Sequence, residues 1–527
     1  MTPLIPKIIH QTWRDHDLPE PRHWPESWKK LNPEWEYRLW TDADLLDLVR
    51  TYYPELEELY LSYPRPVQRA DMGRYLILHH CGGIYADLDT ECLIPLDPLA
   101  ADSRVVLAEE PIEHRYNGIP LGMDRLFFNG VMASPQGHPF WGHVIATLVR
   151  CRHARDHVLE STGPFAFTGA VESFDRPETL ALHSCHIFTA MTAKGGESAG
   201  RPHGPHGDTR FCTHYWRGSW FPKGRHRRHR LKRAIARARY RLTRGAFLDR
   251  DEAARNIDVS LLHRPVTATD RNVAVLIPVR DGEPFLDRCM ELLHQLDYPR
   301  DRLKIVFCEG DSKDRSAERL REIATGTCGF RDIVLTEHRT GAPLDRARRS
   351  IPKLQHERRA NLARVRNHLI DHGLDATDDW ALWLDVDVCD YAPDTLNRLL
   401  AERHKVVTPD CVRDWGGPSY DLNAFHDSAE RRDHRYYRHV HRGLYMPPAS
   451  HDRRRHLHDL RFLDRVPLSS VGGTMLLVHA AVHRAGLRFP ELPYDDLLET
   501  EGFGRMCRDF GVMPLGLPNL QIRHVKS

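Results

Sequence analysis

Two apolar runs of strand length, one in each half of the chain, place the strongest limit on the fold. They read IPKIIHQTW at residues 5–13 and NVAVLIPVRD at residues 272–281. Each is followed by a segment with helical spacing, DADLLDLVRTYYPELEELY in the first half and FLDRCMELLHQL in the second. Strands that alternate with helices predict an α/β sheet in each half. In such sheets ligands gather at the carboxyl ends of the strands.

The length of 527 residues requires more than one core, because single cores stop growing near ~250–300 residues. The clearest break in composition is residues 221–245, which hold eleven Lys or Arg and no Asp or Glu. We therefore expect one domain at residues 1–220, a basic linker at 221–268 and a second domain at 269–527. The basic segment is either a solvated linker or surface helix, or a helix that contacts anionic lipid or a phosphorylated acceptor.

Composition excludes several classes of protein. The net charge of +2 does not indicate a nucleic-acid binder. The eleven cysteines include no CxxC pair, which disfavours a disulfide framework and a cysteine zinc site. Neither a signal peptide nor an apolar span of ~18–20 residues is visible. We expect a cytoplasmic protein. Residues 221–245 leave open a peripheral association with the inner face of a membrane. The sequence does not indicate the oligomeric state.

An Asp-x-Asp motif occurs in both halves of the chain. GGIYADLDT at residues 82–90 carries Asp87 and Asp89, and WALWLDVDV at residues 380–388 carries Asp385 and Asp387. All-oxygen ligation suits Mg²⁺ or Mn²⁺, which typically bridge the phosphates of a nucleotide. The pattern by itself is weak, and a pair of surface acids is the plain alternative. A phosphatase with a D-x-D-x-T/V motif is disfavoured, because the fifth position is Glu91 in one pair and Cys389 in the other.

The first half resembles glycosyltransferase family 32, whose members carry a DXD sugar-transfer region. The resembling stretches are IPKIIHQTW, RADMGRYLILHHCGGIYADLD, NGVMASPQGHPFW, TGPFAFTGA and THYWRGSW, over about residues 5–220. The resemblance implies that Asp87 and Asp89 hold the metal and the donor, with Asp89 and His214 as metal ligands. Asp71 and Arg74 match positions that hold donor hydroxyls, although an ordinary surface ion pair is the alternative. The other donor-binding residues that it implies are Trp13, Asn129, Trp216, Ser219 and Trp220.

The second half resembles glycosyltransferase family 62, the Anp-type mannosyltransferases. The resemblance covers about residues 272–525 and is most specific in VGGTMLLV and LETEGFGRM. It implies that Asp385 and Asp387 hold the metal and the donor, with Asp387 and His524 as metal ligands. Glu501 is expected to be catalytic, because it opens a predicted helix whose N-terminus would lie at the site. The donor-binding residues that it implies are Arg366, Asn367 and Glu499. The His- and Arg-rich stretch at 426–465 is expected to be a surface insertion.

Together these resemblances imply two GT-A-like domains in tandem, each a Rossmann-like mixed sheet. Each would use Mn²⁺ or Mg²⁺ and a nucleotide sugar, with retention of anomeric configuration. GDP-mannose is the expected donor of the second half, and the acceptor is a growing glycan, a polysaccharide or a glycolipid. Two alternatives stay open. One domain is only an acceptor-binding module, or the enzyme glycosylates a protein.

Overall fold

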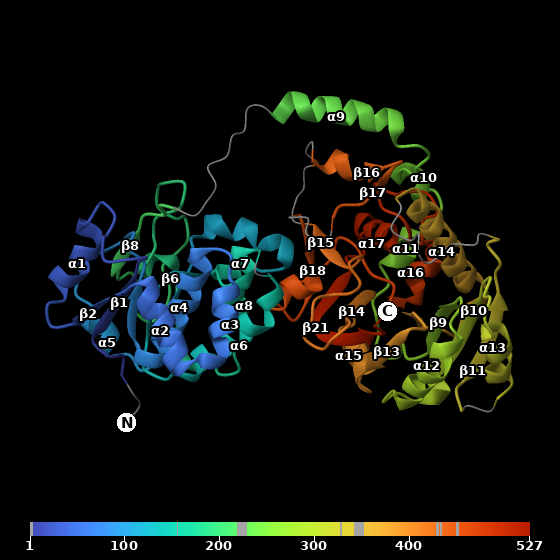
Figure 1. Ribbon diagram of the computed structural model, residues 1–527, viewed down its shortest axis with the longest axis horizontal. Helices are drawn as coiled ribbons and strands as arrows, with labels where there is room; N and C mark the ends of the chain where they lie inside the picture. The colour runs from blue at the N-terminus through green and yellow to red at the C-terminus, as the bar shows by residue number, and fades with distance from the viewer. Residues whose placement is uncertain are drawn as a thin grey trace. The chain divides into compact units, whose positions relative to one another are not determined.

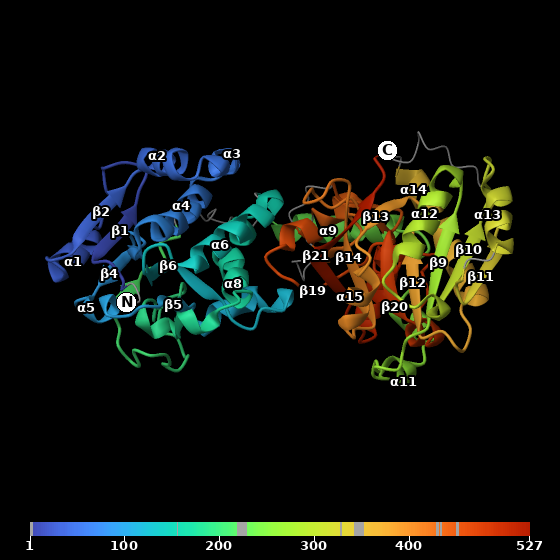
Figure 2. The same cartoon turned by 90° about the horizontal axis from the view of Figure 1, so that it is seen from below.

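The computed structural model describes residues 4–154, 156–218, 229–326, 329–341, 352–427, 432, 435–448 and 453–526. The chain forms two compact units, drawn in Figures 1 and 2. Unit 1 consists of Met1–Lys223 with Asp459–Leu463, and unit 2 of Gly224–His458 with Asp464–Ser527. Among the helices of the described residues, none combines the length and the apolar character needed to span a membrane.

Unit 1 is built on a mixed sheet of six strands. Their order is β2 (Glu36–Trp40), β1 (Ile8–Thr12), β3 (Gly83–Ala86), β6 (Phe127–Ser134), β5 (Val105–Glu109) and β7 (Leu180–His183). Strand β1 runs parallel to β2 and β3, and β6 runs antiparallel to β3. The predicted helical stretch forms α2 (Asp42–Tyr52) and α3 (Glu57–Ser62), interrupted at Pro54. Pro54 has no N–H to continue α2, which explains the break.

Two glycines join helix α4 (Pro66–Cys81) to strand β3. Gly82 and Gly83 have φ angles of 67° and 89°, in the left-handed region that favours glycine. A Cβ atom on Gly82 would lie 2.5 Å from the backbone nitrogen of Gln136, so the turn also needs the missing side chain. This turn lets the chain leave α4 and enter β3, which ends immediately before Asp87. The predicted order of helix, glycine turn, short strand and acids is confirmed.

Unit 2 is built on a larger mixed sheet. Its strands follow the order β11 (Asp332–Glu337), β10 (Leu303–Glu309), β9 (Val273–Val279), β12 (Trp380–Leu384), β20 (Met475–His479), β14 (Val406–Val412), β21 (Leu515–His524) and β13 (Val388–Tyr391), with β19 (Val466–Pro467) also paired to β21. The first four are parallel, and β20 is antiparallel to β12. Both units are therefore mixed α/β sheets, as predicted.

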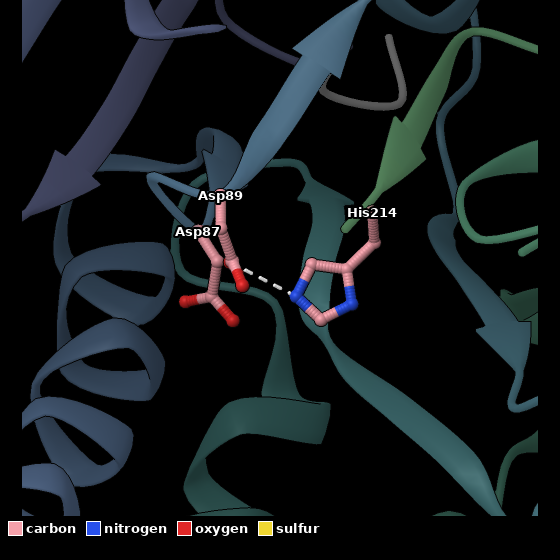
Figure 3. A group of neighbouring side chains, drawn as sticks. All are labelled: Asp87, Asp89 and His214. Carbon is pink, nitrogen blue, oxygen red and sulfur yellow. Dashed lines mark hydrogen bonds and ion pairs between the residues drawn. The ribbon is translucent and has the colours of Figure 1, made fainter. Parts of the chain in front are cut away.

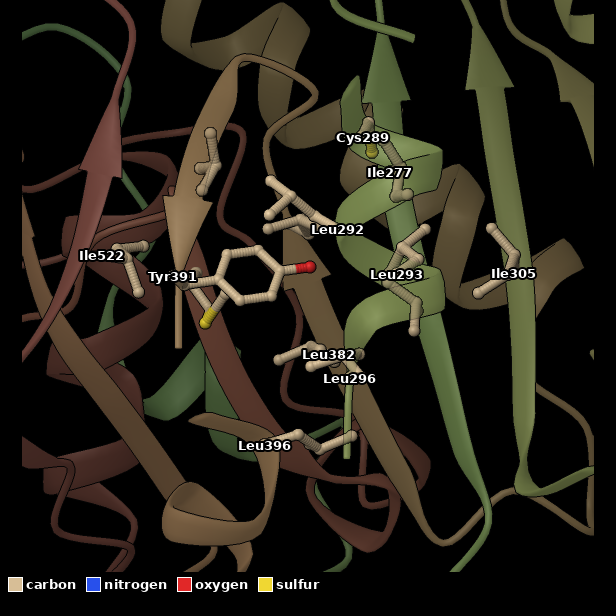
Figure 4. Packing of buried hydrophobic residues seen from close by; sticks show 14 of the residues in the cluster. Ile277, Cys289, Leu292, Leu293, Leu296, Ile305, Leu382, Tyr391, Leu396 and Ile522 are labelled. Atoms are coloured by element: carbon tan, nitrogen blue, oxygen red, sulfur yellow. The ribbon is translucent and has the colours of Figure 1, made fainter. Parts of the chain in front are cut away.

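Helix α12 (Glu283–Gln295) buries its apolar stripe against the parallel strands of unit 2. Figure 4 shows Leu292 and Leu293 of α12 beside Ile277 and Leu382, with Tyr391 packed next to them. These side chains are almost fully removed from water. Burial of this kind stabilises by roughly 1.5–3 kcal/mol for each large apolar side chain. The core thereby fixes β12, the strand that leads into Asp385.

The prediction that residues 426–465 form a surface insertion is wrong for part of the segment. Strand β18 (Arg454–His456) pairs with β15 (Phe425–Asp427), and the side chains of Arg454 and His456 are buried. Arg454 lies over the ring of Phe425, at 3.8 Å from its centroid. A run of charged residues suggests exposure, but here the charge of Arg454 is compensated inside the unit by Glu501.

Candidate active sites

The acids of unit 1 converge with a histidine that comes from the end of another strand. Asp87 and Asp89 follow β3, and His214 ends β8 (Cys212–His214). Nε2 of His214 lies 2.9 Å from Oδ1 of Asp89 (Figure 3). One ligand atom from each of the three residues lies within 4.8 Å of the others. Two carboxylates and one imidazole form a donor set that fits Mn²⁺.

Asp87 is held by a buried arginine and a tyrosine. Nη1 of Arg74 lies 3.2 Å from Oδ1 of Asp87, and the hydroxyl of Tyr85 donates to the same oxygen at 2.9 Å. Nη2 of Arg74 lies 3.1 Å from Oδ1 of Asp71. The side chains of Asp71 and Arg74 are each only 6% exposed. Burial excludes the alternative of an ordinary surface ion pair between Asp71 and Arg74.

The carboxylates of unit 1 differ in their pKa values. Burial raises the pKa of Asp71 to about 7, and it also raises the pKa of Asp87. Burial acts in the same direction on Asp89, but the hydrogen bond and charge of His214, together with the hydrogen bond from the backbone N–H of Arg217, lower the pKa of that carboxyl. Asp89 is therefore ionised at neutral pH, as a metal ligand must be.

The other predicted residues of unit 1 take different places. Asn129 donates its amide N–H to the hydroxyl of Tyr75 at 2.9 Å and to Oδ1 of Asp71 at 3.4 Å. Its backbone oxygen accepts from Nη1 of Arg74 at 2.8 Å, so Asn129 contacts both members of the Asp71–Arg74 pair. Trp13 donates its indole N–H to the backbone oxygen of Asp17, and the structure does not bring it into a hydrogen bond with the acids among the described residues.

The residues that follow β8 pack against His214 and Asp89. The ring of Trp216 lies edge-on to His214 with centroids 4.3 Å apart, and its φ of 49° is a strained, left-handed value. The backbone N–H of Arg217 donates to Oδ2 of Asp89 at 2.9 Å. Ser219 and Trp220, which were predicted to belong to this segment, lie outside the described residues.

Unit 2 repeats the pairing of the second acid with a late histidine. Nε2 of His524, at the end of β21, lies 3.1 Å from Oδ1 of Asp387. Nδ1 of the same ring lies 2.9 Å from the backbone oxygen of Val525, which only accepts, so Nδ1 carries the proton. In the neutral ring Nε2 then holds a lone pair facing a carboxylate. A hydrogen bond to Asp387 therefore needs a second proton on Nε2, and this hydrogen bond and the charge of Asp387 raise the pKa of His524 although burial opposes the shift. If a metal ion is bound, Asp387 and His524 would hold it in place of that proton.

The first acid of unit 2 also has a buried arginine partner. Arg366, on α14 (Pro352–Gly373), directs Nη2 to Oδ1 of Asp385 at 3.4 Å and Nε to Oε1 of Glu499 at 2.8 Å. Burial and the neighbouring carboxylates raise the pKa of Asp385, although Arg366 opposes the shift. Glu499 begins α17 (Glu499–Asp509) with a φ of 56°, so its backbone is strained at the site.

In each unit the loop that carries the acids is supported by a backbone hydrogen bond to the neighbouring segment, which is β6 in unit 1 and the residue just before β20 in unit 2. The backbone N–H of Asp87 donates to the oxygen of Gly130 at 2.8 Å, and that of Asp385 donates to the oxygen of Thr474 at 3.0 Å. A Cβ atom on Gly130 would lie 2.7 Å from Oδ2 of Asp87, and one on Gly473 would lie 2.3 Å from Nη2 of Arg366. Both sites therefore need a glycine beside the acids, on β6 in unit 1 and just before β20 in unit 2.

Two predicted residues of unit 2 have structural partners. Both carboxylate oxygens of Glu501 are in ion pairs, with Nη1 of Arg359 at 2.6 Å and Nη1 of Arg454 at 2.9 Å. Asn367 donates to the backbone oxygen of Phe489 at 3.0 Å and accepts from its N–H at 3.0 Å. The structure therefore does not bring the Asn367 amide to the acids.

Several residues that shape the sites were not predicted from the sequence. They are Tyr85, Gly130, Arg359, Asp421, Arg454 and Gly473. Asp421 accepts from the backbone N–H of Gly473 at 2.9 Å, within a stretch, YDLNAFHD, that belongs to the family resemblance. The sequence shows Tyr85 next to the first Asp pair and Gly473 within VGGTMLLV. It does not show their partners, which lie far away along the chain.

The two halves of the chain match different families of known proteins. Residues 258–493 match the Anp1 family model, and residues 22–106 match a glycosyltransferase sugar-binding region containing a DXD motif. The mannan polymerase complex subunit mnn9 of Schizosaccharomyces pombe is 30% identical over 271 residues, which are 48% of this chain and 79% of that protein. The chain belongs to the Anp1 family.

The first half of this Anp1-family chain has different relatives. Inositol phosphoceramide mannosyltransferase 3 of S. pombe is 40% identical over 196 residues, which are 36% of this chain and 50% of that protein. The chain thus spans about half the length of that relative. The prediction of an enzyme of the glycosyltransferase class agrees with both sets of matches. A solved mannosyltransferase, PcManGT from Pyrobaculum calidifontis in complex with GDP-Man and Mn²⁺, is 15% identical with a TM-score of 0.30, over 56% of this chain and 68% of that one.

Proposed function

We propose that the protein is a bifunctional, metal-dependent retaining glycosyltransferase that adds mannose to a growing glycan, polysaccharide or glycolipid, with one active site in each unit. The observation that carries the proposal is the repeated arrangement. In both units the first acid faces a buried arginine that is itself paired with a buried carboxylate, and the second acid faces a late histidine. A decayed binding module would have no reason to keep this whole set.

The relatives' names support mannose as the sugar. Those of the first half include an inositol phosphoceramide mannosyltransferase, and those of the second half include a subunit of a mannan polymerase complex. We therefore propose GDP-mannose as the donor of unit 2 and the first donor to test for unit 1. Successive additions to one acceptor would explain why the two units share a chain.

In each site, one pair of residues would bind the metal ion and another would orient the first acid. Asp89 with His214, and Asp387 with His524, would hold Mn²⁺ or Mg²⁺, which when bound neutralises the leaving diphosphate. Arg74 fixes Asp87 in one orientation, and Arg366 does the same for Asp385. The buried carboxylates of Asp71 and Glu499 are bound by other nitrogens of the same arginines, and they would accept hydrogen bonds from sugar hydroxyls. The Trp216 segment would exclude water from the unit 1 site.

The test is release of nucleoside diphosphate from a panel of sugar nucleotides, with Mn²⁺ or with EDTA. Asp89→Asn is expected to lower the release that comes from unit 1, and Asp387→Asn the release that comes from unit 2, each by at least about a hundredfold. If GDP-mannose serves both units, each variant removes part of the GDP signal, and the double variant Asp89→Asn/Asp387→Asn removes all of it. The matched controls, Asp47→Asn in unit 1 and Asp301→Asn in unit 2, change exposed acids and should leave both signals intact. If only one site variant loses activity, the other unit is an acceptor-binding module. If no donor gives a signal that EDTA abolishes, the proposal fails.

A further inference from the structure

Helix α9 (His229–Thr243) presents apolar side chains to solvent. Ile235 is 62% exposed and Leu242 is 88% exposed. The alanines at 234 and 238 are exposed as well. Residues separated by three, four or seven positions share one face of a helix, so these four side chains form one continuous apolar stripe. A stripe of this kind is unusual for a surface helix, which normally turns its apolar face inward.

The opposite face of α9 attaches the helix to unit 2. The hydroxyl of Tyr240 donates to Oδ1 of the buried Asp496 at 2.5 Å. The Tyr240 ring also packs against Tyr437, with centroids 5.2 Å apart. The Tyr240 contacts hold this face of α9 (labelled in Figure 1) against unit 2, and Ile235 and Leu242 lie on the exposed face.

Basic side chains flank the apolar stripe. Lys232, Arg237, Arg239 and Arg241 are exposed along α9. The surrounding segment, residues 221–245, contains no Asp or Glu that could neutralise them. A stripe of apolar residues with Lys and Arg on its borders is the pattern of helices that lie in the plane of a membrane interface. A nucleic acid or an acidic protein would attract the cations, but it would not stabilise an exposed leucine in the middle of them.

We propose that α9 is an interfacial helix that binds a membrane surface containing anionic phospholipid. Ile235 and Leu242 enter the boundary between headgroups and acyl chains. Lys232 and Arg239 contact the lipid phosphates. This inference does not depend on the proposed transfer reaction, and it assigns a role to the basic segment that the two active sites do not use.

The test uses the full chain and sedimentation with vesicles, either of phosphatidylcholine alone or of phosphatidylcholine with phosphatidylglycerol. We expect binding to the anionic vesicles and little to the neutral ones. The double variant Ile235→Ser/Leu242→Ser should weaken binding by roughly tenfold or more, because two apolar side chains no longer leave water. Lys232→Gln and Arg239→Gln should each weaken it by roughly fivefold, and added salt should weaken the binding of the wild-type chain.

Matched variants on unit 1 control for nonspecific binding of the protein to vesicles. Leu61→Ser/Ile119→Ser removes two other exposed apolar side chains, and Lys30→Gln/Arg115→Gln removes two other exposed cations. Neither should change vesicle binding. As a second readout, hydrogen exchange of the backbone amides of residues 234–243 should slow when anionic vesicles are added.

Two results would overturn the proposal. Equal binding to neutral and anionic vesicles would remove the role of the cations. If removal of the cations weakens binding but Ile235→Ser/Leu242→Ser has no effect, the contact is electrostatic only and the apolar stripe does not enter the membrane.

Discussion

Arg366 and Glu499 form a buried ion pair beside the acids of unit 2, with Nε of Arg366 2.8 Å from Oε1 of Glu499. The same guanidinium reaches Asp385 with Nη2. Replacement of Arg366 by Met should destabilise unit 2 by about 3–5 kcal/mol, because Glu499 keeps an unpaired buried charge. Donor turnover in unit 2 should be lost as well, since Asp385 is no longer oriented. Chemical unfolding and nucleotide release measure the two effects.

The double variant Arg366→Met/Glu499→Gln separates these two roles of Arg366. It removes both charges of the pair, so most of the lost stability should return. Turnover should stay low, because Asp385 still lacks its partner. Recovery of turnover together with stability would mean that Arg366 has only a structural role.

Glu501 is expected to position its neighbours rather than react. Both of its oxygens are already in ion pairs with Arg359 and Arg454, which lower its pKa although burial opposes this. Glu501→Gln should therefore lower the free energy of unfolding of unit 2 by about 3 kcal/mol or more. The remaining activity should keep the wild-type pH profile. Loss of one limb of that profile, with no change in stability, would instead identify Glu501 as an acid or base.

Much of both sites could be predicted from the sequence, because the sites follow local signals. Asp87 and Asp385 each end an apolar run, and the rule for the carboxyl ends of strands places such residues at the ligand-binding edge of a sheet. Gly82 and Gly83 likewise predicted the turn that precedes Asp87, because glycine adopts backbone angles that other residues avoid.

The partners of these residues could not be predicted, because they depend on contacts between distant segments. Arg454 belongs to a stretch whose charge indicates exposure, but Glu501, 47 positions further along the chain, compensates it inside unit 2. Asn367 neighbours Arg366 in sequence. Its side chain nevertheless binds the backbone of Phe489, because adjacent residues of a helix point in different directions.

Stability of unit 2 should fall as the pH is lowered from 6.5 towards 4, through His483. Nδ1 of this buried histidine donates to the oxygen of Leu487 at 3.0 Å, and Nε2 accepts from the indole N–H of Trp383 at 3.2 Å. Burial lowers the pKa of His483 from 6.5 to about 4. Between these pH values the unfolded chain binds a proton that the folded unit does not, so folding loses up to about 3 kcal/mol.

The measurement for His483 is unfolding by denaturant at several pH values, for the wild type and His483→Gln. Glutamine retains a donor and an acceptor but does not titrate. The variant should be less stable than the wild type at pH 7, and the difference should shrink as the pH approaches 4. A difference that stays constant with pH would show that the ring is not neutral in the folded unit.

Gly130 and Gly473 should each tolerate no side chain, with an effect confined to the unit that contains them. In Gly130→Ala the added methyl would lie 2.4 Å from Cζ of Phe128 and 2.7 Å from Oδ2 of Asp87, so the carboxylate must move. Donor turnover in unit 1 should fall by at least about tenfold, since small displacements of site residues are costly. Gly473→Ala should do the same in unit 2, by displacing Arg366.

Gly142→Ala, on helix α6 (Pro139–Arg150), is the matched control. It meets no atom within 4 Å, and it should leave both activities unchanged and raise stability by up to about 1 kcal/mol. Full activity of both site variants would show that these two glycines do not fix the geometry of the acids.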